Sequence, residues 1–155
     1  MVDVGGQRSE RKKWLKYFHG IEAVLFIVAM SEYDQYTPED SKVNRMHESL
    51  KVFGQICMNK WLLESALLLF LNKKDVFEEK IVYSSLRQCF PEYKGAEETI
   101  AASIYIRQQF RCQERDERKV YYHFTNAKDT KNIKIIFEVM VDTIKNTIIS
   151  EAGLA

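Results

Sequence analysis

Apolar and polar positions alternate along the chain in blocks that predict an α/β fold. Uninterrupted apolar runs at Ala23–Ala29 and Leu67–Leu71 are typical of strands buried on both faces of a sheet. Val120–Phe124 is a third run, rich in aromatic residues, and we expect a third strand there. Helical patterns separate the three runs, so the sheet is expected to be mostly parallel.

The longest internal helix is expected between the first two strands. Ser31–Asp40 is polar and contains Pro38, which indicates a loop in which Thr37 caps a helix that starts at Pro38. Apolar residues recur at helical spacing as far as about Asn59. This apolar stripe consists of Val43, Met46, Leu50, Phe53 and Ile56.

Three further helices are expected in the second half of the chain. A short polar helix is expected at Val76–Ile81. A longer one is expected from about Glu97 to Phe110, after a loop marked by Pro91 and Gly95. The last helix is the clearest, because apolar residues fall on one face from Ile133 to Ile148.

Composition narrows the class of protein. The length of 155 residues predicts one domain, residues 1–155, and 46% hydrophobic residues are enough for a core. Acidic and basic residues nearly balance, with a net charge of +1, which argues against a nucleic-acid binder. Three widely spaced cysteines favour a reduced, intracellular protein, and their spacing to the three histidines does not indicate a metal site.

Three short segments carry side chains suited to a ligand. Ligands of parallel α/β sheets bind at the loops that leave the carboxyl ends of strands. The first segment begins at Asp3, whose carboxylate can hold a water of Mg²⁺. A glycine beside it lets a backbone N–H approach a phosphate oxygen, and Gln7 can orient an attacking water. This first segment consists of Asp3, Val4, Gly5, Gly6 and Gln7.

The other two segments directly follow predicted strands and suit a guanine base. In Asn72–Asp75, the carboxylate can accept both the ring N–H and the exocyclic amine of guanine. The aliphatic stem of a lysine in the same loop can lie over the base while its ammonium stays in water. In Thr125–Lys128, the small residue Ala127 leaves its backbone N–H free to meet the guanine carbonyl oxygen.

The chain resembles the C-terminal part of the α subunit of a heterotrimeric G protein. The resemblance is carried by DVGGQRSERKKW, NRMHES, FLNKKD, FPEY and HFTNAKDT, in this order, and it covers essentially the whole chain. It implies a partial Ras-like P-loop GTPase domain with three layers and a mostly parallel sheet. A small GTPase of another Ras-like family is a weaker alternative, because the DVGGQ segment and the final helix argue against it.

The resemblance also implies a role for each motif residue. Asp3 would support Mg²⁺ through water, Gly6 would meet the γ-phosphate, and Gln7 would position the nucleophilic water. Asn72, Lys73 and Asp75 would select guanine, with Ala127 completing the base pocket. The residues expected to contact GTP or GDP are thus Asp3, Val4, Gly5, Gly6, Gln7, Asn72, Lys73, Lys74, Asp75 and Ala127.

Partners and location follow from the same resemblance. A switch helix with Arg8, Lys12, Lys13 and Trp14 would meet the βγ dimer, effectors and GTPase-activating regulators. The final helix and the tail 148–155 would face a G protein-coupled receptor. The complete form is expected to be a GTP-hydrolysing signal transducer in the cytoplasm, at the inner face of the plasma membrane.

The sequence departs from this family in what it lacks. No G-x-x-x-x-G-K-[ST] motif occurs in the 155 residues. Switch I, the transition-state arginine and the helical insertion domain are not recognisable either. We therefore expect a chain that starts where a longer protein has been cut, given a partial gene model or re-initiated. We also expect an unpaired edge at the strand of Ala23–Ala29 and little GTPase activity of its own. The alternative function is a non-catalytic interaction module for receptor, effector or βγ.

Overall fold

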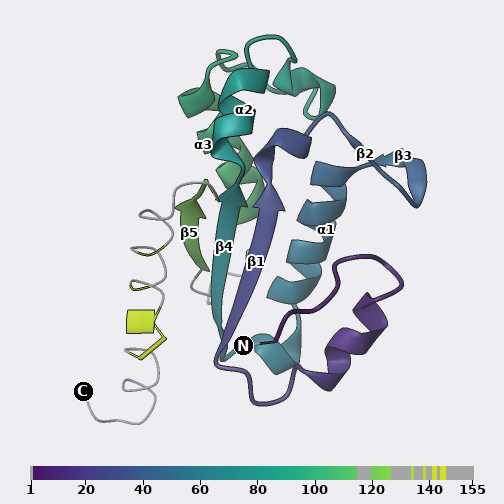
Figure 1. Ribbon diagram of the computed structural model, residues 1–155, viewed down its shortest axis with the longest axis vertical. Coiled ribbons are helices and arrows are strands. Elements are labelled where there is room, and N and C mark those ends of the chain that lie inside the picture. The colour runs from purple at the N-terminus through teal and green to yellow at the C-terminus, as the bar shows by residue number, and fades with distance from the viewer. Residues whose placement is uncertain are drawn as a thin grey trace.

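The computed structural model describes residues 2–114 and 120–126, together with six positions between 134 and 145 (Figure 1). Its 3-10 helices are η1 (Arg11–Lys16), η2 (Met30–Glu32), η3 (Lys60–Leu62) and η4 (Leu86–Gln88). Its strands are β1 (Ala23–Ala29), β2 (Tyr36–Thr37), β3 (Asp40–Asn44), β4 (Ala66–Asn72) and β5 (Val120–Phe124). Its α-helices are α1 (Arg45–Cys57), α2 (Lys74–Lys80) and α3 (Thr99–Arg111). In this described part, no helix has the length and apolar character needed to span a bilayer.

The main sheet confirms the three predicted strands and their direction. Its order is β1-β4-β5, and both neighbouring pairs are parallel. Ala29 pairs with Asn72 at the carboxyl ends of β1 and β4, and Leu71 pairs with Phe124 at the corresponding end of β5. The loops that leave these strands therefore start from the same edge of the sheet.

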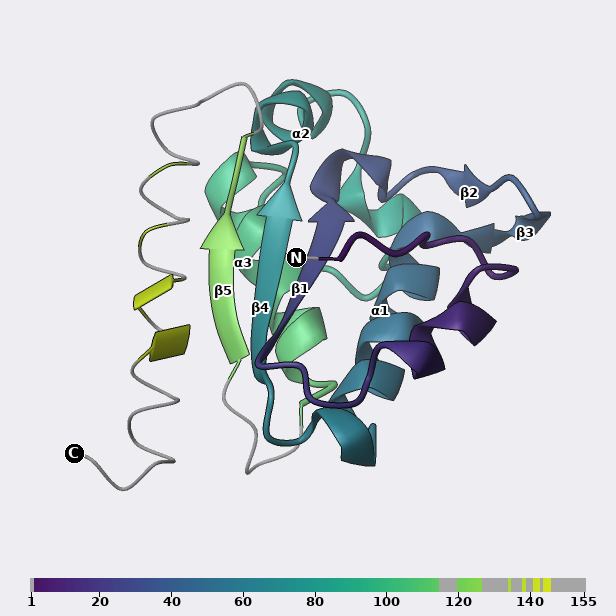
Figure 2. The ribbon, with the colours of Figure 1, turned by 60° about the horizontal axis from the view of Figure 1, so that its bottom comes forward.

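Helices α1 and α3 pack on one face of this sheet (Figures 1 and 2). Phe53 on α1 is fully buried at the centre of this layer. Its ring centroid lies 5.3 Å from that of Phe26 on β1 and 5.4 Å from that of Phe110 on α3. Burial of each such ring contributes roughly 1.5–3 kcal/mol, so this aromatic column joins the sheet to both helices.

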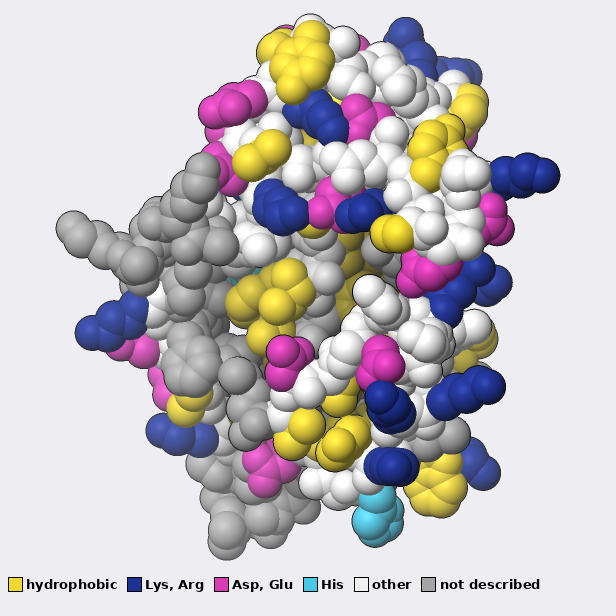
Figure 3. Space-filling view, turned by 45° about the vertical axis from the view of Figure 1, so that its right-hand side comes forward, with side chains coloured by type: hydrophobic (Ala, Val, Ile, Leu, Met, Phe, Trp, Pro, Cys, Tyr) yellow, Lys and Arg dark blue, Asp and Glu magenta, His cyan; other side chains and the backbone are white. Residues whose placement is uncertain are grey.

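The opposite face of β1 is exposed, which corrects the expectation that this strand is buried on both faces. Side chains alternate between the two faces of a strand, and Leu25 and Ile27 point away from α1. Ile27 is 58% exposed, whereas Leu68 on the same face of β4 is 1% exposed and lies in a cluster that includes Ile144. Within the described sheet β1 is an edge strand. Figure 3 shows hydrophobic side chains gathered near the middle of the face in view.

Helix α1 begins at Arg45 and not at Pro38, so the predicted start and its Thr37 cap were wrong. Thr37 Oγ1 donates to the carbonyl oxygen of Asp40 at 2.9 Å, and this local bond stabilises a turn in place of a helix. The chain on either side pairs as the antiparallel hairpin β2–β3. The residue that caps α1 is Asn44, whose Oδ1 accepts from the backbone N–H groups of the first turn.

We expect Asn44→Ala to lower the free energy of unfolding by about 1–2 kcal/mol. The substitution leaves two backbone donors of α1 without their acceptor, because Asn44 Oδ1 lies 2.8 Å from Met46 N and 3.2 Å from His47 N. Urea denaturation measures the effect. The matched control is Asn59→Ala, since Asn59 caps only the short η3 through Trp61 N. A loss no larger than that of the control would contradict this role.

The remaining helices lie close to their predicted places. Helix α2 begins at Lys74, two residues before the expected Val76, and α3 begins at Thr99 and not at Glu97. Both differences are within the usual uncertainty of helix ends. Most of the final helix expected at Ile133–Ile148 lies outside the described residues.

Candidate functional site

The loops that follow β4 and β5 are joined at the carboxyl edge of the sheet. Thr125 Oγ1 donates to Asn72 Oδ1 at 3.1 Å, and Lys74 N donates to the Thr125 carbonyl oxygen at 3.2 Å. Thr125 N in turn donates to the carbonyl oxygen of Leu71 at 2.9 Å. Two of the three predicted segments thus meet here, whereas Ala127 lies outside the described residues.

Lys73 occupies an unusual backbone conformation within the loop after β4. Its φ of 58° and ψ of 39° lie in the left-handed region, which costs a non-glycine residue roughly 1–2 kcal/mol. The Lys73 carbonyl oxygen accepts from Phe77 N at 2.9 Å, so the residue directs the chain from β4 straight into α2. The turn places Asp75 in the first turn of α2, where it is half-buried.

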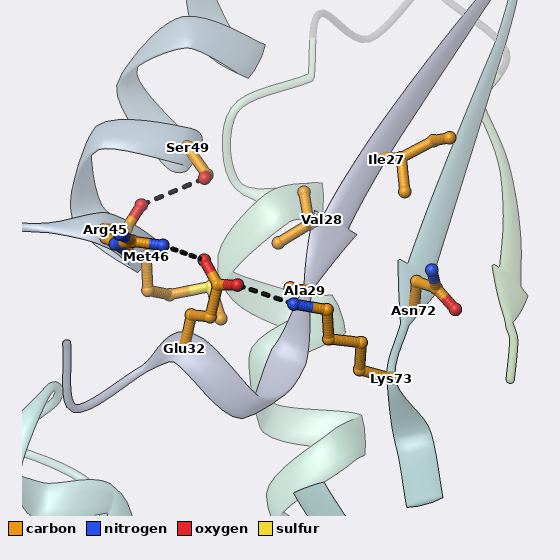
Figure 4. Close-up of a pocket in the computed structure, with 9 residues that line it drawn as sticks. All are labelled: Ile27, Val28, Ala29, Glu32, Arg45, Met46, Ser49, Asn72 and Lys73. Atoms are coloured by element: carbon orange, nitrogen blue, oxygen red, sulfur yellow. Dashed lines mark hydrogen bonds and ion pairs between the residues drawn. The ribbon is translucent and has the colours of Figure 1, made fainter. Parts of the chain in front are cut away.

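A carboxylate from another part of the chain holds this loop. Glu32 Oε1 accepts from Lys73 Nζ at 2.7 Å, and Glu32 Oε2 accepts from Arg45 Nη1 at 2.9 Å (Figure 4). Burial disfavours the charged form of Glu32, but the bonds from Lys73 and Arg45 outweigh it and hold the pKa of this carboxyl below its ordinary value. Glu32 is therefore a charged bridge between the loop and α1.

A pocket of about 250 Å³ opens beside this bridge, at the carboxyl ends of β1 and β4 (Figure 4). Its lining consists of Ile27, Val28, Ala29, Glu32, Arg45, Met46, Ser49, Asn72 and Lys73. The end of β1 lies along one side of the pocket, and Asn72 with the Glu32 ion pairs lies along another. The pocket thus combines the ends of two parallel strands with the charged side chains of Glu32, Arg45 and Lys73.

Helix α2 is fixed to the same edge by a second, more buried ion pair. Lys80 Nζ lies 2.5 Å from Asp34 Oδ1 and also donates to the Ser31 carbonyl oxygen at 3.0 Å. The second oxygen of Asp34 accepts from Ser84 Oγ at 2.7 Å. These bonds attach the end of α2 to η2 and the turn after it, so both ends of the helix are held.

The predicted segment Asp3–Gln7 lies on the surface, with all five residues exposed. Trp14 Nε1 donates to the Gly5 carbonyl oxygen at 2.9 Å, and Arg11 Nε donates to that of Gly6 at 3.2 Å. The donors come from η1, which lies beside α1 in Figures 1 and 2. The segment is thus held on the α1 side of the molecule.

Glu48 on α1 anchors η1 and the residues before it. Its Oε1 lies 2.6 Å from Arg11 Nη1, and its two oxygens accept from Arg8 at 3.2 Å each. Burial opposes the charge of Glu48, but the bonds from Arg8 and Arg11 prevail and lower the pKa of its carboxyl. Because Arg11 also holds the Gly6 carbonyl, the position of Gly6 is linked to α1 through two side chains.

The described residues do not build a magnesium site by themselves. Asp3 is exposed, and no group of three or more His, Cys, Asp or Glu side chains in the described ranges is arranged to hold a metal ion. Mg²⁺ is commonly held by one or two carboxylates, with waters and nucleotide phosphates as its other ligands, so Asp3 fits as one contributor to such a site.

Sequence reasoning did not single out Glu32, Glu48 or Lys80. Each has a partner that lies 37 to 46 positions away along the chain, so no local pattern pointed to these side chains. Comparison with known families fits the motifs: a family model described as G-protein alpha subunit matches residues 1–144. The match includes all three predicted segments.

Proposed function

Because the chain belongs to the G-protein alpha subunit family, we propose that the loop Asn72–Asp75 binds the guanine base of GDP or GTP. The parallel sheet with its covering helices is part of a Ras-like GTPase domain. The observation that carries the proposal is the left-handed turn at Lys73, held by Glu32 and joined to the β5 loop at Thr125.

Each residue of this loop has a task that its chemistry permits. The Asp75 carboxylate would accept the ring N–H and the exocyclic amine of guanine, which adenine does not offer in this arrangement. Asn72 would support the loop through its bond with Thr125. The aliphatic part of Lys73 would lie against the base, and Lys74 would remain at the solvent edge. The backbone N–H of Ala127 would meet the carbonyl oxygen of the base.

In the complete protein we assign GTP hydrolysis to the segment Asp3–Gln7. A water molecule oriented by Gln7 would attack the γ-phosphorus of GTP. As the new P–O bond forms, the bond from the γ-phosphorus to the β,γ-bridging oxygen breaks, and GDP and inorganic phosphate are the products. The Gly6 backbone would sense the γ-phosphate, and Asp3 and Mg²⁺ would interact through water. Arg11 donates both to the Gly6 carbonyl oxygen and to Glu48, and these bonds support a switch because they connect this segment to α1.

The same switch region is the proposed meeting place for the βγ dimer, effectors and GTPase-activating regulators, with the receptor at the C-terminal end. Lys12 is exposed and available to a partner, whereas Trp14 is half-buried, packs against the core and donates to Gly5. The complete form would act at the inner face of the plasma membrane. A non-catalytic interaction module is the second candidate, favoured by the missing G-x-x-x-x-G-K-[ST] motif.

Base selection gives the direct test of the proposed function. We expect Asp75→Asn to shift the preference from GDP toward xanthosine diphosphate by at least about tenfold, because the amide no longer matches both guanine donors. Competition binding at matched protein concentration measures this shift. Asp40→Asn is the control, since its Oδ1 can still accept from Lys42 N. An unchanged preference would mean that Asp75 does not contact the base.

Phosphate release then separates the two candidate functions. If the protein releases phosphate from GTP faster than its own Gln7→Leu variant does, the hydrolytic switch is supported. Nucleotide binding without release above that level favours the interaction module.

A further inference from the structure

We propose that Glu32 is a positioning residue of the base-recognition loop: it keeps Lys73 in its left-handed conformation and joins the loop to α1. The inference rests on the proposed function, because it concerns the same site. It assigns a task to a residue on η2, which precedes the loop by 41 positions.

The conformation of Lys73 needs support from outside the loop. Among the described residues it is the one non-glycine position with a positive φ. Such a conformation persists only where surrounding contacts outweigh its cost. The backbone bond from Phe77 N begins α2, but the strongest contact of the side chain is the 2.7 Å bond from its ammonium to Glu32.

Glu32 is well placed to give this support because its other oxygen is already fixed. Arg45 Nη1 holds Glu32 Oε2, while Arg45 Nε donates to the Tyr36 carbonyl oxygen at 3.0 Å. The backbone of Arg45 is held as well, since its N–H donates to Gln35 O at 2.8 Å. The guanidinium is thus secured at two points, and the carboxylate that it orients is ready to receive Lys73.

Charge explains why a neutral residue would not serve. Glu32 lies between Arg45 and Lys73 (Figure 4), and its side chain is 23% exposed. Without the negative charge, two cations would face each other beside the pocket with nothing to compensate them. Lys73 is 47% exposed and can withdraw into solvent, so the loop would lose its hold while the rest of the fold stays intact.

The bridge also decides which part of Lys73 can meet a ligand. With the ammonium bound to Glu32, the aliphatic part of Lys73 remains to lie against a planar ring, and both residues line the 250 Å³ pocket. Glu32 would therefore raise affinity for the base without touching it. This effect acts through Lys73 and has to disappear when Lys73 is replaced.

A double-mutant cycle tests this dependence, with GDP as the probe. Glu32→Gln is expected to weaken GDP binding about tenfold, which is the loss expected for one charge-assisted hydrogen bond. Lys73→Asn removes the ammonium but tolerates the left-handed conformation. The double variant Glu32→Gln/Lys73→Asn is expected to bind no more weakly than Lys73→Asn alone.

Two further variants sharpen the result. Glu64→Gln is the matched control, because Glu64 is exposed and precedes the opposite end of β4. It is expected to bind GDP as the wild type does. Glu32→Asp keeps the charge on a shorter side chain and is expected to recover part of the affinity; it also serves if Glu32→Gln fails to fold.

The outcomes distinguish this inference from the proposed function. Additive losses in the cycle, or unchanged binding by Glu32→Gln, overturn the positioning role. If the wild-type chain binds no GDP at all, the proposed function fails. The same double-mutant cycle is then measured by the amide hydrogen exchange rates of residues 73–75. Faster exchange in Glu32→Gln that vanishes in the Lys73→Asn background then supports the role of Glu32, and equal exchange overturns it.

Discussion

Lys80→Met is expected to lower the free energy of unfolding by about 3–5 kcal/mol, the typical loss when one partner of a buried ion pair is removed. The side chains of Lys80 and Asp34 are 16% and 14% exposed. Methionine fills a similar volume but leaves the Asp34 carboxylate without its cation. It also removes the donor to Ser31 O and the ammonium that lies 5.6 Å from the Tyr33 ring centroid.

Denaturation with urea measures this loss of unfolding free energy. Two further variants show whether it comes from the ion pair. Lys51→Met makes the same change at an exposed position of α1 and is expected to cost less than about 0.5 kcal/mol. Lys80→Met combined with Asp34→Asn is expected to recover part of the stability, because the buried negative charge is then absent as well. Equal effects of Lys80→Met and Lys51→Met would show that the pair contributes nothing to the fold.

The strands could be predicted from the sequence because their signal is local. Strand β4 is the apolar run Leu67–Leu71 with one residue added at each end, and Val120–Phe124 is β5 itself. The start of α1 was missed for a physical reason. Helical spacing continues upstream of Arg45, but Asn44 offers its side chain to the first turn and Thr37 stabilises a competing turn.

One part of the candidate site could be predicted from the sequence, and another part could not. The loop Asn72–Asp75 was recognisable because its residue types follow directly on a strand. Glu32 and Lys73 are 41 positions apart, and Asp34 and Lys80 are 46 apart, so no local pattern relates these partners. Tertiary packing alone brings them together. The exposed face of β1 was missed because an apolar run does not reveal whether both faces are covered.

Glu48→Gln is expected to lower the free energy of unfolding by roughly 2–4 kcal/mol near neutral pH, because it replaces one carboxylate that serves two guanidinium groups. The Glu48 side chain is 10% exposed, and its closest contact is 2.6 Å to Arg11 Nη1. Loss of this contact should also free the segment Asp3–Gln7. Trp14 fluorescence in a Trp61→Phe background reports that release, since Trp14 donates to Gly5.

The pH dependence of this loss identifies its electrostatic origin. The pKa of Glu48 in the folded chain lies below its ordinary value of 4.5, so the unfolded chain takes up the proton first as pH falls. The stability that Glu48 contributes is therefore complete above about pH 4.5 and is lost as pH falls through the lower folded pKa. The difference in free energy of unfolding between wild type and Glu48→Gln should therefore be constant at neutral pH and should shrink in acid.

The pKa of Glu32 is lowered as well, but Glu32 is present in both proteins, so its effect cancels from this difference. Glu78→Gln, an exposed change on α2, is expected to show no such gap. A gap that persists unchanged well below pH 4.5 would mean that Glu48 stabilises the fold by packing and not by its charge.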